Sequence, residues 1–413
     1  MTKGRAPMED TGKNLESIQE MNRTLILKLL QRNRLCSRAR LAKQSGLKQA
    51  TITNIINDFI SWDIVRETGS IEGKKGRRSI GLTINDQKFF VVGVRLTRRF
   101  YSVGLFNIVG DEILLYKKEQ VPGTGLTLLL HRIKKDIKDL IAGNPDKHIV
   151  AIGVAVPGPY YSKVGEIEPV ADFPGWERIS LKEELQKGFD VPVVVDHDAN
   201  AGVLAECTLS SEPHDDDTIG YVAVGQGIGS GIYHKGEIMK GSQGIAGEIG
   251  HTSIMFNGLR CECGNRGCLT LYASSIAFLN LALKERQACA DEDTSLPMEF
   301  DFAMLAKAVR EKDKFAYRIF KRVMKYLGAG ITNIIYSYNP SLIIIGDEVS
   351  EIGLPVVEEL EKLISKLTIK RVINQLEIRL TSFDKDPADY GAAALAINRA
   401  FSMPLLFSDS KNA

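Results

Sequence analysis

The densest group of metal-ligand residues in the chain lies between positions 251 and 268. His251 is followed by Cys261, Cys263 and Cys268 within a short, polar, glycine-rich segment. One imidazole and three thiolates form the closed tetrahedral set that is typical of structural Zn²⁺. Three free, buried cysteines are the alternative, and it is disfavoured because this segment offers little apolar core. The spacing therefore predicts a structural zinc site at these four residues.

A second group of chemically capable residues follows an apolar segment at 191–195, which reads as a buried strand. Side chains at the end of such a strand project into the crevice of an α/β fold. Asp198, placed there, can accept a hydrogen bond or a proton from a sugar hydroxyl. The alternative is that Asp198 caps a helix over Ala199–Glu206, and the local pattern alone favours that cap.

The third group is the glycine-rich segment Gly225–Gly231, which follows a predicted strand over Ile219–Val224. Glycines let backbone N–H groups approach a ligand closely. They also form plain tight turns, so this segment by itself leaves both interpretations open.

The elements that must position these groups form a long α/β body behind a small basic head. Residues 1–85 hold 16 Lys and Arg against 8 Asp and Glu, whereas the rest of the 413-residue chain holds 37 against 43. This asymmetry indicates a polyanionic partner for the head. Strands alternate with helices from Phe89 onward, which predicts α/β layering. No apolar run is long enough to span a membrane, and the start of the chain lacks a signal peptide's apolar core.

The sequence of the head predicts three helices followed by a basic hairpin. Residues 1–14 read as a mobile tail, and Ser37 caps a second helix that Gly46 ends. In the third helix, Ile52, Ile55, Ile56 and Phe59 share one face. This order resembles a winged helix-turn-helix, whose third helix enters the major groove of DNA. A helical oligomerisation domain with a solvated basic loop is the less favoured alternative. The predicted DNA contacts are Lys48, Gln49, Thr51, Thr53 and Asn54 on the helix and Lys74, Lys75, Arg77 and Arg78 on the wing.

Several of these motifs together resemble the repressor, open-reading-frame, kinase (ROK) family over residues 15–400. The resemblance rests on Asp198-Ala199-Asn200, the glycine-rich segment, Gly247-Glu248-Ile249-Gly250-His251, the three cysteines, Pro157-Gly158 and Pro174-Gly175-Trp176. It implies a two-lobed actin-like, hexokinase-type ATPase fold behind a winged helix-turn-helix. The expected domains are the head at 15–85, a first lobe at 86–200 and a second lobe at 201–413 that carries the zinc loop. We also expect a terminal helix that returns to the first lobe.

The resemblance also indicates whether this chain is a kinase or a repressor. Kinases of the family carry an Asp-x-Gly-Gly-Thr phosphate loop after the first strand and glycines at the adenosine. The corresponding positions here are Arg95, Thr97, Arg98 and Arg99 in the loop, and Asp347 and Glu348 at the adenosine. Losing the acidic group and gaining bulky cations opposes metal-assisted phosphate transfer. The chain is therefore expected to be no enzyme, with Asp198 as a vestigial base. An active sugar kinase with an accessory head is one alternative, and a regulator controlled by a protein partner is another.

Sugar contacts carried over from the family are altered at the edges of the predicted pocket. Asp198, Glu248 and His251 are retained, whereas His197 stands in place of an Asn. Thr270 stands in place of a Glu after the last cysteine, and Asp172 in place of an Asn near Pro174. The resemblance thus implies a sugar-responsive repressor of carbohydrate-utilisation genes, similar to xylose- and glucose-type repressors. Its expected partners are a sugar effector and palindromic operator DNA, bound as a homodimer or dimer of dimers in the cytoplasm, with no membrane contact.

Overall fold

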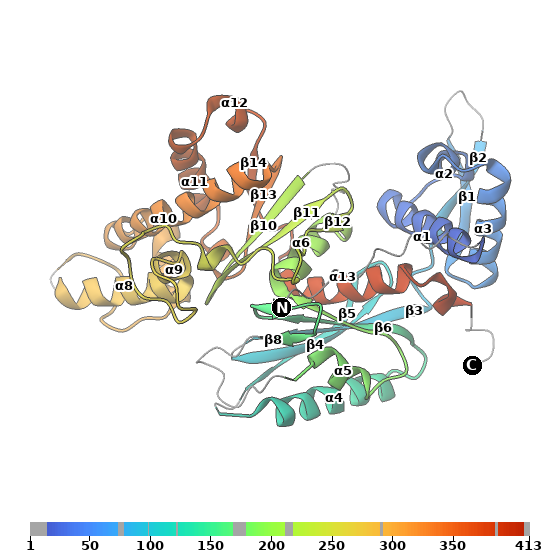
Figure 1. Ribbon diagram of the computed structural model, residues 1–413, viewed down its shortest axis with the longest axis horizontal. Helices are drawn as coiled ribbons and strands as arrows, with labels where there is room; N and C mark the ends of the chain where they lie inside the picture. The colour runs from blue at the N-terminus through green and yellow to red at the C-terminus, as the bar shows by residue number, and fades with distance from the viewer. Residues whose placement is uncertain are drawn as a thin grey trace, which may run out of the picture. The chain divides into compact units, whose positions relative to one another are not determined.

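The computed structural model describes residues 15–72, 78–97, 99–120, 123–167, 179–210, 218–289, 292–384 and 387–408 (Figure 1). Its contacts divide the chain into two compact units. The first, the head, comprises Met1–Phe89 and Asn398–Ala413, and the second, the body, comprises Phe90–Ile397. None of the described helices combines the length and apolarity that crossing a bilayer requires.

The head contains three helices and a two-stranded antiparallel sheet. They are α1 (Leu15–Asn33), α2 (Arg38–Ser45), α3 (Gln49–Ser61), β1 (Val65–Glu72) and β2 (Arg78–Ile84). The Ser37 hydroxyl accepts a hydrogen bond from the Arg40 backbone N–H, and Gly46 ends α2 at φ +71°, as predicted. The four residues of the predicted stripe on the third helix are all buried, which confirms the prediction.

Residues late in the chain complete the core of the head. The short helix η3 (Pro404–Phe407) contacts α1. The Phe407 ring is fully buried and packs edge-on against Phe89, with 5.0 Å between the ring centroids. Burying aromatic rings in this way stabilises the head through apolar area removed from water.

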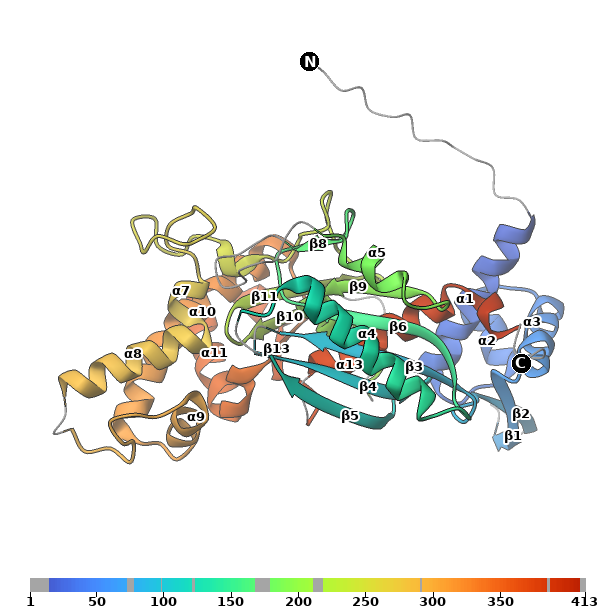
Figure 2. The ribbon, with the colours of Figure 1, turned by 90° about the horizontal axis from the view of Figure 1, so that it is seen from below.

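The first lobe of the body is built on a five-stranded sheet with the order β5-β4-β3-β6-β9. Its elements are β3 (Phe89–Leu96), β4 (Phe100–Asn107), β5 (Glu112–Glu119), α4 (Leu126–Ala142), β6 (His148–Val156), β7 (Tyr160–Tyr161), β8 (Glu166–Ile167), α5 (Leu181–Gln186) and β9 (Val193–His197). Helices α4 and α5 cover one face of this sheet, and α13 (Pro387–Phe401) covers the other (Figure 2).

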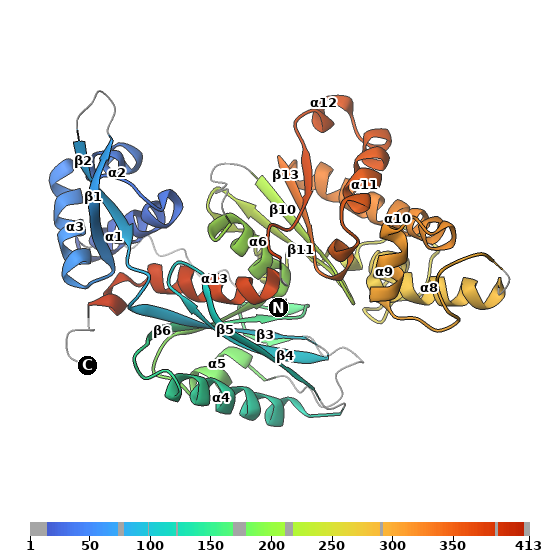
Figure 3. The same cartoon turned by 180° about the vertical axis from the view of Figure 1, so that it is seen from behind.

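The second lobe is built on another five-stranded sheet, with the order β12-β11-β10-β13-β14. Its elements are α6 (Asp198–Thr208), β10 (Thr218–Val224), β11 (Ile228–His234), β12 (Glu237–Ile238), η1 (Ile249–His251), α7 (Thr270–Ala273), α8 (Ser275–Ala288), α9 (Phe302–Arg310), α10 (Lys314–Tyr338), β13 (Leu342–Gly346), η2 (Glu348–Ile352), α11 (Leu354–Leu367), α12 (Lys370–Ile373) and β14 (Glu377–Leu380). Helix α6 lies on one face, and α10 and α11 lie on the other (Figure 3).

The two sheets share one strand order, in which a three-stranded meander is followed by two further strands. Helices α6 and α13, one from each repeat, approach so closely that a Cβ on Gly391 would lie 2.6 Å from the Ala201 carbonyl carbon. Likewise, a Cβ on Gly153 of β6 would lie 2.0 Å from the Ala392 carbonyl oxygen, so α13 packs directly on the first sheet. The body thus consists of two similar α/β halves joined through helices α6 and α13.

The glycine-rich segment, for which the sequence left both a ligand-binding backbone and a plain tight turn open, contains a tight turn at Gly225–Gly227. Strand β11 then begins at Ile228. Gly231 lies within that strand, where a Cβ would come 2.3 Å from the Ala199 carbonyl oxygen of α6. The glycines of β11 therefore permit close packing of helix α6 against the strand.

Candidate functional site

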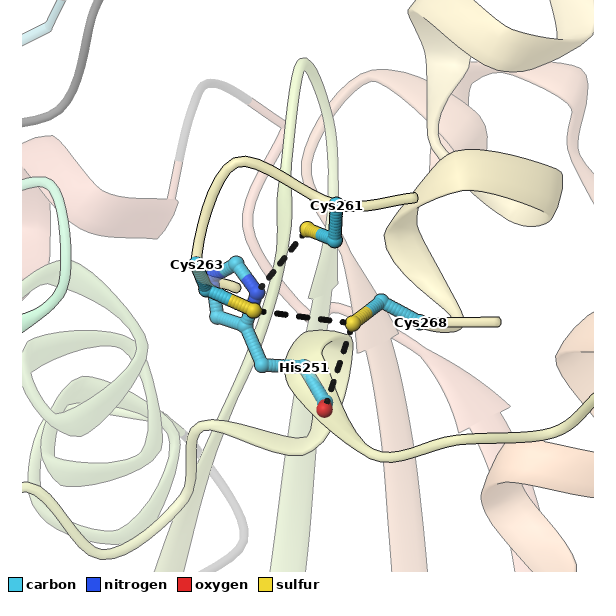
Figure 4. A group of neighbouring side chains, drawn as sticks. All are labelled: His251, Cys261, Cys263 and Cys268. Atoms are coloured by element: carbon cyan, nitrogen blue, oxygen red, sulfur yellow. Dashed lines mark hydrogen bonds between the residues drawn. The ribbon is translucent and has the colours of Figure 1, made fainter. Parts of the chain in front are cut away.

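Four side chains from the segment between positions 251 and 268 converge on one point (Figure 4). The ligand atoms of His251, Cys261, Cys263 and Cys268 all lie within 4.8 Å of one another. The Cys261 Sγ is 3.6 Å from the His251 Nδ1, and the Cys263 Sγ is 3.7 Å from the Cys268 Sγ. Tetrahedral zinc with Zn–S bonds of about 2.3 Å places its sulfur ligands roughly 3.8 Å apart. The four residues thus fit a bound metal ion.

Hydrogen bonds hold the segment between positions 251 and 268 in this conformation. The Cys261 N–H donates to the Asn265 carbonyl (2.8 Å), and the Asn265 side chain donates to the His251 carbonyl (3.0 Å). Gly267 adopts φ +69°, and a Cβ there would lie 1.8 Å from the Met255 carbonyl oxygen. Only glycine fits at that turn, which brings Cys268 back beside Cys263.

A compact polar cluster lies where β9 ends and α6 begins. The His197 Nε2 is 3.0 Å from the Asp198 Oδ1, and its ring is almost fully buried. Gly158 faces this ring from the first lobe: a Cβ there would lie 2.8 Å from the His197 Nε2 and 2.5 Å from the Glu248 Oε1. Three predicted sugar contacts, His197, Asp198 and Glu248, therefore lie side by side.

The carboxylates around His197 set its charge. Burial alone lowers the pKa of His197, but the nearby carboxylates of Asp198 and Glu248 outweigh it and raise the pKa to about 9. Burial likewise raises the pKa of Asp198, but His197 and Arg95 outweigh it and lower the pKa below its usual value. At neutral pH the cluster therefore holds an imidazolium at His197 beside an ionised carboxylate at Asp198, and that carboxylate can accept hydroxyl hydrogen bonds.

Asp198 does not cap a helix over Ala199–Glu206. Helix α6 begins at Asp198 itself, and His197 occupies the N-cap position without a side-chain capping bond. The Asp198 side chain is 20% exposed, so a ligand can reach it. Its neighbour Asp196 is fully buried and accepts hydrogen bonds from the His197 N–H (2.8 Å) and the Asn200 side chain (3.0 Å). This network, together with an ion pair to Lys240, fixes the turn that presents Asp198.

Sequence reasoning missed one contact between the lobes. The Arg95 side chain, at the end of β3, is 5% exposed, and its terminal nitrogen lies 3.8 Å from the Asp347 Oδ1. Asp347 follows β13 in the second lobe. Both positions had been singled out as departures from the kinase pattern. Their pairing was not predictable, because it depends on how the two sheets face each other.

The other predicted site residues lie as follows. Thr270 begins α7, two residues after Cys268, and is half-buried. Thr97 is half-buried and donates its hydroxyl to the Phe100 carbonyl, 2.8 Å away, whereas Arg99 is exposed. Asp172, Lys74, Lys75, Arg77 and Arg98 lie outside the described residues, as does the side chain of Arg78 at the start of β2.

Helix α3 presents the predicted DNA contacts around its first turns. Lys48, at the N-cap, makes no capping bond, and both Lys48 and Gln49 are exposed. Asn54 is exposed, whereas Thr51 and Thr53 are half-buried. The Thr53 hydroxyl donates to the Gln49 carbonyl of its own helix at 2.9 Å.

The ROK family matches residues 105–399, which is more than half of the chain. The chain belongs to the ROK family. A xylose repressor from Caldicellulosiruptor bescii is 29% identical over 94% of this chain and 98% of its own length. Among solved structures, a ROK family transcriptional regulator, a homologue of the Escherichia coli MLC protein, is 26% identical over 95% of this chain and 98% of its own, with a TM-score of 0.79.

The body of this ROK chain has the fold of the family's kinases. A ROK glucokinase from Streptomyces griseus, solved with glucose and AMPPNP, aligns over 74% of this chain and 99% of its own with a TM-score of 0.64 at 24% identity. The expected actin-like, kinase-type α/β fold is thereby confirmed. The glucokinase covers less of this chain than the transcriptional regulator does, so only the latter spans nearly its full length.

Proposed function

We propose that this ROK protein is a sugar-responsive DNA-binding repressor of carbohydrate-utilisation genes. The observation that carries the proposal is the near full-length similarity to repressors and transcriptional regulators of the family. A relative that shared only the kinase-like body would give no support for DNA binding.

The head serves as a winged helix-turn-helix. Its three short helices and antiparallel hairpin have the order of that fold, and α3 buries one complete apolar face. Polar residues at the start of α3, Gln49 and Asn54 above all, are exposed and suit hydrogen bonds to base edges in the major groove. The basic residues between β1 and β2 then contact phosphates as the wing.

The effector is a sugar that binds at Asp198, Glu248 and His251. Carboxylates and imidazoles are suited to the many hydroxyl donors of a sugar. His197 fills the edge of the site beside Gly158, so the site differs in shape from one that carries an Asn. Thr270 and Asp172 complete the proposed site.

A structural Zn²⁺ is the metal that His251, Cys261, Cys263 and Cys268 hold. The bound ion supplies rigidity to the loop and takes no part in chemistry. His251 uses its Nδ1 for the metal, since that atom faces the Cys261 sulfur. The other edge of the His251 ring would then contact the sugar. A bound metal would therefore fix the orientation of one sugar-binding side chain.

Kinase activity is absent in this proposal. Arg95 occupies the position of the phosphate-loop aspartate and lies close to Asp347. A cationic side chain at that position leaves no acidic group to hold the metal ion of a nucleotide.

The experiment that tests the function has two parts. Operator sites are first selected from random DNA with the full-length chain, and affinity is measured by fluorescence anisotropy with and without D-xylose, D-glucose and a panel of disaccharides. We expect one sugar to change operator affinity, and no ADP release with any sugar in a coupled assay. ADP release would favour the kinase, and DNA binding that no sugar changes would favour control by a protein partner.

A further inference from the structure

Asp347 holds a backbone conformation that its residue type rarely adopts. Its φ is +66° and its ψ is −166°, a region that favours glycine. The Asp347 carboxylate accepts a hydrogen bond from the Glu348 N–H at 2.9 Å. A glycine would adopt this backbone without strain. The presence of an aspartate at this position therefore indicates a role for its carboxylate.

The Asp347 carboxylate is seated in a notch in the second lobe. A Cβ on Gly225 would lie 2.3 Å from the Asp347 Oδ2, so only glycine at position 225 leaves room for it. The Gly225 carbonyl in turn accepts the Ser275 N–H (2.8 Å), and the Ser275 hydroxyl donates to Glu348. The turn, the start of α8 and the start of η2 thus form one packed support for the carboxylate.

Arg95 reaches this carboxylate from the first lobe. Its guanidinium lies over the Phe100 ring, 5.7 Å from the centroid, and 3.8 Å from the Asp347 Oδ1. This separation is too long for a hydrogen bond, but the near-complete burial of Arg95 leaves little water to screen the attraction. Burial raises the pKa of Asp347, and the nearby charge of Arg95 opposes this rise.

We propose that Arg95 and Asp347 form an ionic clamp that links the two lobes of the body. The clamp joins the end of β3 in the first lobe to the residue that precedes η2 in the second lobe.

The clamp is a property of the chain without sugar or DNA, so it can fail while the proposed function stands. Asp347→Gly removes the carboxylate and relieves the strained backbone, and it should therefore fold. Lys235→Gly is the matched control, because Lys235 also has a positive φ (+50°) but lies in the exposed β11–β12 turn. Arg95→Gln and the Arg95→Gln/Asp347→Gly double variant complete a mutant cycle.

Hydrogen exchange of the full chain, followed by mass spectrometry, measures the link directly. The reporters are the Gly225 and Thr97 amides, which donate to the Gly227 and Phe100 carbonyls on opposite sides of the clamp. We expect Asp347→Gly to speed exchange severalfold in both segments, with Lys235→Gly unchanged and the double variant no faster than Asp347→Gly alone. Exchange in Asp347→Gly equal to that in Lys235→Gly would overturn the proposal, as would additive effects of the two substitutions. Should Arg95→Gln not fold, the comparison of the two glycine variants decides alone.

Discussion

The imidazole of His197 and the carboxylate of Asp198 form an ion pair at the junction of β9 and α6, with 3.0 Å between Nε2 and Oδ1. Glu248 lies beside the same ring, because a Cβ on Gly158 would lie 2.8 Å from the His197 Nε2 and 2.5 Å from the Glu248 Oε1. The charge of Arg95, on the first lobe, helps to lower the pKa of Asp198. A ligand that hydrogen-bonds to Asp198 therefore acts on a group already coupled to both lobes.

We expect Asp198→Asn to abolish the sugar response and to leave sugar-free operator affinity nearly unchanged. The amide loses one acceptor and the charge that pairs with His197, whereas the head is untouched. Operator affinity with and without the responding sugar measures both effects. Asp139→Asn, at an exposed position of α4, is the control. A variant that loses thermal stability but keeps a normal sugar response would contradict the effector role of Asp198.

Stability should fall as pH rises through the range in which His197 loses its proton. The pKa of His197 is raised from its ordinary value of 6.5 to about 9 in the folded chain. A raised pKa contributes stability that is fully present below about pH 6.5 and lost as pH rises through about 9, by up to roughly 3 kcal/mol. Urea unfolding at pH 6, 7.5 and 9 of wild type, His197→Asn and the exposed-site control His131→Asn measures this. The same pH dependence in wild type and His197→Asn would refute it.

Metal analysis of chain purified without chelator should find one zinc per chain. Cys263→Ser should lose the metal, lower the unfolding temperature and weaken sugar binding, because His251 loses its orientation. Cys289→Ser is the matched control, since Cys289 is also exposed but lies outside the cluster. Wild-type chain without zinc, or a Cys263→Ser variant that keeps it, would rule out the site.

Arg77→Ala and Arg78→Ala should each weaken operator binding and reduce its salt slope by about one, if each residue contacts one phosphate. Arg66→Ala is the control, because Arg66 lies on the same hairpin but pairs with Asp86 at 3.1 Å. Anisotropy titrations over a series of salt concentrations give both affinity and slope. Unchanged values in both wing variants would show that the wing does not touch DNA.

The chain should form a homodimer or a dimer of dimers on its operator. One recognition helix contacts too few base pairs to give specificity. Two heads bound to the two halves of a palindrome would contact enough of them. Light scattering at micromolar concentration, with and without operator DNA, tests the expectation. A strictly monomeric chain in the presence of DNA would contradict it.

Local signals predicted much of the molecule. The apolar stripe of α3, the Ser37 cap and the Gly46 stop each depend on neighbours along the chain, and all three are found in the structure. The ligands of the metal cluster were equally predictable, because their chemistry and spacing constrain them strongly.

Features that depend on three-dimensional proximity were not predictable in the same way. Periodicity does not distinguish a ligand-binding loop from a glycine-rich strand, so β11 was missed until its packing against α6 was seen. The buried Glu206 of α6 accepts hydrogen bonds from Thr381 and Ser382 beyond β14, a contact between distant segments. The shared strand order of the two sheets is visible only in their topology, because the amino-acid sequence shows no repeat that would have predicted it.

The completion of the head by residues near the other end of the chain has a consequence for biosynthesis. Domains generally fold as they leave the ribosome, in order from the N-terminus. The head is translated first, yet the Phe407 ring that packs on Phe89 arrives only after the whole body has been made. The core of the head therefore stays incomplete in a nascent chain until translation has passed η3.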